Sequence, residues 1–271
     1  MTRRPILRLA VALLFAATGV LAAATQRQTP PVAGPLRADV VRVAAAADLK
    51  FALDEIAARL VRQQPPIRIQ PTYGSSGNMH AQLQQRAPFD IYLSADVEYP
   101  RDLVRRGIGS ERDLFTYARG KLVVWVRKQS KLEVEREGWA ALRSARRIAI
   151  ANPRHAPYGR AAEQALRGAG LWQDEGGRIV LGENVAQAAQ FVDSGAADVG
   201  IIAKSLALAP VMRSAGRFWD VPEDAYMPLQ QGGLILPWAV SRDAAARVRD
   251  YLLSDTGRTL LTSYGFALPE N

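Results

Sequence analysis

The 271-residue chain contains no cysteine and only two histidines, His80 and His155. Without cysteine there are no disulfides, no thiolate nucleophile and no thiolate metal site. With only two histidines, a histidine-rich metal site is disfavoured as well, so we expect no direct protein ligands to a metal ion. The sequence therefore predicts neither a cofactor nor a cysteine-dependent or metal-dependent enzyme.

Acidic residues are outnumbered, because 26 aspartates and glutamates face 35 lysines and arginines, for a formal net charge of +9. The arginines are scattered, and clusters do not exceed pairs such as Arg105 with Arg106 or Arg146 with Arg147. A nucleic-acid interface would need basic residues gathered on one face or element. We therefore predict no nucleic-acid partner and a solvated basic surface that mildly attracts anions.

Long apolar runs are confined to the N-terminus, where residues 9–24 (LAVALLFAATGVLAAA) follow the acid-free segment MTRRPILR. The basic start, the apolar run and the small residues Ala22 and Ala24 are typical of a secretory signal peptide, assigned to residues 1–24. A retained anchor is the weaker interpretation, because spanning needs roughly 18–20 apolar residues. No cysteine follows, which excludes lipid attachment through an N-terminal cysteine. Residues 25–38 are rich in proline and small polar residues and predict a flexible leader, so we expect a soluble periplasmic protein.

From Asp39 onward, strand patterns alternate with helix patterns. The strands are expected at residues 40–46, 67–74, 90–96, 121–126, 147–152, 178–184, 197–203 and 232–240. The helices are expected at residues 49–60, 77–86, 158–170 and 185–195, with one long C-terminal helix from about Arg242. Such alternation predicts an α/β fold of right-handed βαβ units around parallel sheets.

Small or polar residues form four of the strand-to-helix junctions. These junctions are Ala47 with Asp48, residues 74–77 with Ser75 and Ser76, residues 156–159 with Tyr158, and residues 183–185 with Val185. Ligands of open α/β sheets bind at the carboxyl ends of the strands, where helices begin. The first N–H groups of a helix lack internal partners and favour an anion. If two α/β lobes face each other, the four helix starts would meet in one cleft and hold an oxyanion.

The two serines also permit other interpretations. Residues 74–78 read GSSGN, so the final glycine of the nucleophile pattern Gly-x-Ser-x-Gly is replaced by Asn78. A catalytic triad would further need His80 or His155 as its base. A secreted serine hydrolase using Ser76 is therefore a minor alternative. Simple helix capping by the serines is a second alternative, against which the three companion junctions count.

Eight segments, in order, resemble the periplasmic molybdate-binding proteins of ABC importers. They are residues 43–57, 73–83, 87–96, 120–126, 147–166, 182–202, 221–226 and 264–269. The resemblance implies the two-lobed type II periplasmic binding protein fold, in which each lobe is a mostly parallel sheet flanked by helices and the ligand lies in the interlobe cleft. It implies one lobe of residues 39–119 plus 225–271 and a second of residues 120–224, with crossings near residues 119–120 and 220–226.

The resemblance also implies which groups contact the ligand. Ser76 matches a serine that donates both its hydroxyl and its backbone N–H. Tyr158 and Val185 match positions that give backbone N–H groups from the second lobe, and Asp48 matches one that gives a backbone N–H from the first. Ser75 is an adjacent candidate.

This chain departs from the family pattern at the first junction. Ala47 and Asp48, both members of the predicted site, stand where the family usually has Ser, Thr or Asn side chains. Because a carboxylate beside a dianion would repel it, we expect the Asp48 side chain to turn away and cap its own helix. Some members place a tyrosine hydroxyl in the site at the position of Ala203, and Tyr158 is a candidate to replace it.

The function implied is that of a non-enzymatic, monomeric receptor that closes around molybdate or tungstate and delivers it to an ABC transporter membrane permease. Neutral donors suit a dianion that only accepts hydrogen bonds, whereas protonated phosphate also needs an acceptor. Sulfate or another tetrahedral oxyanion is the alternative ligand, because only cavity size separates sulfate from molybdate.

Overall fold

The computed structural model describes residues 39–172 and 177–269. The signal peptide and leader expected at residues 1–24 and 25–38 lie outside the described residues. Among the helices of the described part, none has the length and apolar character needed to cross a membrane.

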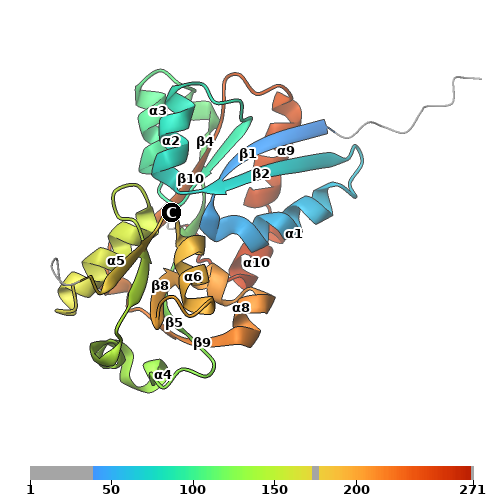
Figure 1. The fold of residues 1–271 in the computed structure, drawn as a ribbon. Coiled ribbons are helices and arrows are strands. Elements are labelled where there is room, and N and C mark those ends of the chain that lie inside the picture. The colour runs from blue at the N-terminus through green and yellow to red at the C-terminus, as the bar shows by residue number, and fades with distance from the viewer. Residues whose placement is uncertain (1–38, 173–176, 270–271) are drawn as a thin grey trace, which may run out of the picture. The chain divides into compact units, whose positions relative to one another are not determined.

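The first of two five-stranded sheets has the strand order β2-β1-β3-β10-β4 (Figure 1). Its strands are β1 (Asp39–Ala46), β2 (Ile67–Gly74), β3 (Ile91–Ser94), β4 (Leu114–Gly120) and β10 (Leu229–Ile235). Strand β1 pairs in parallel with both β2 and β3, whereas β10 pairs antiparallel with β3 and β4. The sheet is therefore mixed, with β10 running against the other four strands.

Helices cover both faces of this sheet. One face packs against α1 (Lys50–Leu60), α9 (Arg242–Leu253) and α10 (Asp255–Ser263), and the other against α2 (Ser76–Gln84) and α3 (Glu98–Arg105). Alternation along β1 places Val41 and Val43 in the first core and Ala44 in the second.

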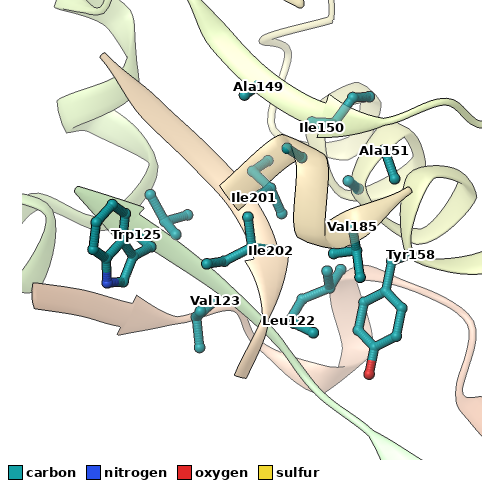
Figure 2. Packing of buried hydrophobic residues seen from close by; sticks show 14 of the residues in the cluster. Leu122, Val123, Trp125, Ala149, Ile150, Ala151, Tyr158, Val185, Ile201 and Ile202 are labelled. Atoms are coloured by element: carbon teal, nitrogen blue, oxygen red, sulfur yellow. The ribbon is translucent and has the colours of Figure 1, made fainter. Parts of the chain in front are cut away.

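The second sheet repeats the topology with the order β7-β6-β8-β5-β9. Its strands are β5 (Leu122–Arg127), β6 (Ile148–Ala151), β7 (Ile179–Gly182), β8 (Val199–Ala203) and β9 (Gly216–Asp220). Its helices are α4 (Val134–Glu137), α5 (Pro157–Gly168), α6 (Val185–Asp193), α7 (Lys204–Ala207) and α8 (Pro210–Ala215). Here β5 is the strand that runs against its neighbours. Trp125, Val123 and Ile202 pack in its core, with Tyr158 and Val185 in the same cluster (Figure 2).

The chain passes between the sheets twice. It leaves the first sheet after β4, enters the second one residue later with β5, and returns through residues 221–228 between β9 and β10. Two sheets flanked by helices, joined in this way, form the two-lobed α/β fold, so the fold prediction is confirmed.

The sequence did not predict β4 and β9, which are edge strands held by β10 and β5, nor the helices α3, α4, α7 and α8. The single long C-terminal helix is wrong, because Ser254 has an extended backbone (ψ 161°) that separates α9 from α10. Its hydroxyl oxygen accepts the N–H of Gly257 at 3.1 Å and so caps the second helix.

A buried carboxylate links three segments of the first lobe. Asp90, 1% exposed, precedes β3 and accepts the backbone N–H of Arg42 at 2.7 Å and that of Val240 at 2.8 Å. The Arg42 guanidinium also donates to both carboxylate oxygens. Burial alone would raise the pKa of Asp90, but these hydrogen bonds outweigh it and leave the pKa below its ordinary value. The ionised form therefore stabilises the fold.

We predict that Asp90→Asn lowers the free energy of unfolding by about 3 kcal/mol at pH 7, because an amide nitrogen would face groups that need an acceptor. Urea unfolding measures this effect. Asp250→Asn, which removes an exposed ion pair with Arg249, is the control and should cost less than about 1 kcal/mol. Equal losses in the two variants would contradict the prediction.

Candidate functional site

One pocket lies where four helix starts meet. Its lining residues are Ala46, Ala47, Asp48, Gly74, Ser75, Ser76, Ala95, Ala156, Pro157, Tyr158, Asn184 and Val185. All six residues that the sequence analysis predicted for the site are among them. The cavity volume is about 10 Å³, close to the space that one water molecule needs.

The second lobe contributes the starts of α5 and α6. At α6, the Asn184 side chain accepts the N–H groups of Ala186 and Gln187, each at 3.0 Å, which leaves the amide of Val185 for the pocket. Helix α5 begins with Pro157, which has no N–H, so the amide of Tyr158 is the first one there. Neither of these two amides has a carbonyl partner within its own helix.

The first lobe contributes the start of α2. The hydroxyl oxygen of Ser76 accepts the N–H of Ala95 at 3.0 Å, which leaves its hydrogen free to donate. The amide of Gly77 is already used, because it donates to the carbonyl oxygen of His155 at 2.8 Å. The Ser75 hydroxyl lies 2.8 Å from Nδ1 of the same histidine. Ser76 therefore offers both its hydroxyl and its amide, while Ser75 links the two lobes.

The geometry does not favour a hydrolytic role for Ser76. Nε2 of His80 lies 2.8 Å from Asp102 on α3. Among the side-chain hydrogen bonds of the described residues, the Ser76 hydroxyl is joined to the Ala95 amide and to no histidine side chain. No general base is therefore in place for Ser76 to act as a nucleophile.

The Asp48 side chain lies elsewhere than expected. Instead of turning to its own helix, oxygen Oδ2 accepts the Tyr158 hydroxyl at 3.0 Å and the amide nitrogen of Gln231 at 2.5 Å. The carboxylate is thus a contact between the lobes, and the residue is 1% exposed. The Tyr158 hydroxyl, a candidate donor in the sequence analysis, is thus engaged with Asp48.

Gln231 is a residue of this region that the sequence analysis missed. It lies on β10, is fully buried, and its amide oxygen lies 2.9 Å from the Tyr117 hydroxyl. The sequence feature that could have indicated Gln231 is its place in the strand segment LQQGGLI, where the alternation of buried positions predicts an apolar side chain.

Burial raises the pKa of Asp48 to about 6. The hydrogen bonds from Gln231 and Tyr158 act in the opposite direction and offset part of this effect, with smaller contributions from nearby backbone amides. Burial and the neighbouring Asp48 charge together raise the pKa of Tyr158 well above its ordinary value. Tyr158 is therefore a neutral donor at physiological pH.

Fold and pocket together define a two-lobed α/β protein with a small cleft lined by backbone and hydroxyl donors. Residues 41–267 match the family described as bacterial extracellular solute-binding protein, and the chain belongs to this family. The family points to a binding role.

Relatives within the family carry a more specific description. The chain is 34% identical over 229 residues to the molybdate-binding protein ModA of Azotobacter vinelandii, covering 84% of this chain and 90% of that protein. It is 32% identical over 232 residues to ModA of Rhodobacter capsulatus, covering 86% and 90%. The resemblance seen in the sequence is thereby confirmed.

Solved structures agree with this assignment. The periplasmic molybdate-binding protein of Azotobacter vinelandii superposes with a TM-score of 0.78 at 30% identity, covering 85% of this chain and all of that chain. The sulfate-binding protein SubI of Mycobacterium tuberculosis gives a TM-score of 0.69 at 15% identity, covering 86% and 88%. That second likeness concerns the fold alone.

The raised pKa of Asp48 makes the stability of the protein depend on pH. The Asp48 carboxyl group binds its proton more tightly in the folded state than in the unfolded chain. Its contribution to the free energy of unfolding is therefore fully present below pH 3.8 and is lost as pH rises through about 6. We predict that the stability of Asp48→Asn, relative to the unsubstituted protein, increases by up to about 3 kcal/mol between pH 4 and 7. Urea unfolding across this range measures the difference.

The control for this experiment is Asp90→Asn, because the pKa of Asp90 is lowered in the folded protein, whereas that of Asp48 is raised. Its stability relative to the unsubstituted protein should fall, not rise, as pH increases from the acid range. If the difference in free energy of unfolding between Asp48→Asn and the unsubstituted protein stays constant from pH 4 to 7, the pKa of Asp48 is not raised by folding.

Proposed function

We propose that the chain is a periplasmic receptor that binds molybdate, and also tungstate, and delivers it to the membrane permease of an ABC transporter. The observation that carries the proposal is the meeting of free helix-start amides and the Ser76 hydroxyl in one small pocket. The names of the molybdate-binding relatives support the same ligand.

The donor set suits a tetrahedral dianion. Such an anion only accepts hydrogen bonds, and no lysine or arginine is among the described residues that line the pocket. Neutral donors avoid the cost of burying a cation. Hydrogen bonds to charged groups contribute roughly 1.5–3 kcal/mol each, so the amides of Ser76, Tyr158 and Val185 and the Ser76 hydroxyl would supply roughly 6–12 kcal/mol before ordering costs. Nanomolar affinity corresponds to about 12 kcal/mol.

Binding in this pocket requires the two lobes to move. The donors come from both lobes, and the cavity is small, so an anion with four oxygens enters only when the helix starts separate. The connections between the sheets provide the hinge, and closure then brings all donors to the ligand. We propose that the closed form is the one the permease recognises. A monomer suffices, since one chain provides every donor.

Calorimetric titration of the protein, freed of copurified ligand, tests the proposal. We expect one-to-one binding of molybdate and of tungstate, and weak or no binding of phosphate. Ser76→Ala should weaken molybdate binding by roughly 10- to 100-fold, since it removes one charge-assisted hydrogen bond. Ser214→Ala is the control, because this exposed serine on α8 bonds only within its own segment.

The same titration separates the alternative ligands. Sulfate binding tighter than molybdate binding would make the chain a receptor for sulfate. If none of molybdate, tungstate, phosphate and sulfate binds, the proposal of an oxyanion receptor is contradicted.

A second prediction tests closure through Gly77. A Cβ added there would lie 2.6 Å from the carbonyl oxygen of His155 and 2.9 Å from the Tyr99 hydroxyl. Gly77→Ala should therefore hold the lobes apart and weaken molybdate binding at least tenfold, although alanine favours the helix. Small-angle scattering in saturating ligand should show incomplete closure.

The matched control is Gly168→Ala at the end of α5, where an added Cβ meets no heavy atom within 4 Å. It should bind and close as the unsubstituted protein does. Unchanged affinity in Gly77→Ala would show that the close approach at His155 is not part of the bound state.

A further inference from the structure

The two oxygens of the Asp48 carboxylate differ in their surroundings. Oδ2 receives two donors, the Tyr158 hydroxyl and the Gln231 amide nitrogen. The Tyr117 hydroxyl beside the Gln231 amide oxygen keeps the nitrogen of that amide turned to Asp48. With both donors on Oδ2, a proton bound to the carboxyl group has its place on Oδ1.

Oδ1 is a buried oxygen with no hydrogen-bond partner among the described residues. Asp48 lines the pocket, whereas Gln231 lies behind it and does not. The neighbouring Ala47 offers no side-chain donor to the same region. The pocket therefore has one unused polar atom on its first-lobe side.

The groups packed around Asp48 are neutral. Tyr158 from α5 and Tyr117 from β4 are phenols whose pKa values are raised, chiefly by burial. The Ser205 hydroxyl, from α7, donates to the Asp48 carbonyl oxygen. The ionised carboxylate thus has no cation within this shell of described residues to offset the charge of an incoming anion.

We propose that Asp48 is a specificity-determining residue that takes up one proton on Oδ1 as the oxyanion binds and donates that hydrogen to an anion oxygen. The proton comes from solvent and returns there when the ligand leaves. Uptake converts a repelling acceptor into an additional donor for a fully deprotonated anion. Since the pKa of Asp48 already lies near 6 before the anion enters, this uptake near neutral pH is inexpensive. The inference rests on the proposed function.

Isothermal titration with molybdate, in buffers of different ionisation enthalpy at pH 7.5, counts the protons taken up per anion. We expect close to one proton, and an affinity that falls by up to about tenfold for each pH unit above 6. Asp48→Asn should bind molybdate with no proton uptake and with an affinity independent of pH between 6 and 8.5.

Two further variants make the test specific. Tyr158→Phe keeps the carboxylate but removes a bond that lowers its pKa, so the decline in affinity should begin at a higher pH. Asp90→Asn alters a buried carboxylate outside the pocket and should keep the proton uptake of the unsubstituted protein.

The outcomes separate the inference from the function on which it rests. Molybdate binding with no proton uptake, and with the same pH profile in Asp48→Asn, would overturn the inference and leave the receptor function intact. Tight binding of hydrogen phosphate without proton uptake, lost in Asp48→Asn, would also overturn it, because Oδ1 would then be an acceptor. Absence of binding by any oxyanion at any pH would overturn both.

Discussion

Backbone N–H groups at the start of a helix have no partner within that helix, and the candidate site depends on this property. A side chain that caps the start competes for these groups, so each junction has to leave at least one amide unused. At α6, Asn184 caps the two following amides and leaves that of Val185. At α5, proline removes one donor and leaves that of Tyr158. The strand order of the two sheets then brings these starts to one place.

Next to these donors lies a buried hydrogen-bond network of Asp48, Tyr158 and Gln231. Holding an anion by neutral donors alone does not require this network. Asp48, Tyr158 and Gln231 are all buried at the contact between the lobes, where an ionised carboxylate is costly. An asparagine at position 48 would avoid this cost. Under the proposed proton uptake, the carboxylate instead makes the contact sensitive to charge in the pocket. Burial of the Asp48 carboxylate thus lowers the free energy of unfolding at neutral pH, and the same burial would allow Asp48 to take up a proton when an anion binds.

The sequence was sufficient for the features that are local. Small and polar junction residues marked Ser76, Tyr158 and Val185 as candidates, because each junction follows from its own strand and helix, and all three line the pocket. The same reasoning failed where distant segments decide the outcome. The orientation of Asp48 depends on Gln231, 183 residues away, and the contact of Ser75 with His155 joins the two lobes. Edge strands β4 and β9 were missed because segments such as LFTYARG and GRFWD mix charged and aromatic residues without a clear alternation.

The position of β10 between β3 and β4 has a consequence for the order of synthesis. The whole second sheet is made before residues 229–235 leave the ribosome, yet these residues occupy an inner position in the first sheet. Until they arrive, β3 presents an unpaired edge and β4 has no neighbouring strand, and such surfaces are prone to association with other chains. The first lobe, whose synthesis begins first, therefore completes its sheet after the second lobe does. A nascent chain with this connectivity remains unfinished, and open to chaperones, until nearly all of it has been translated.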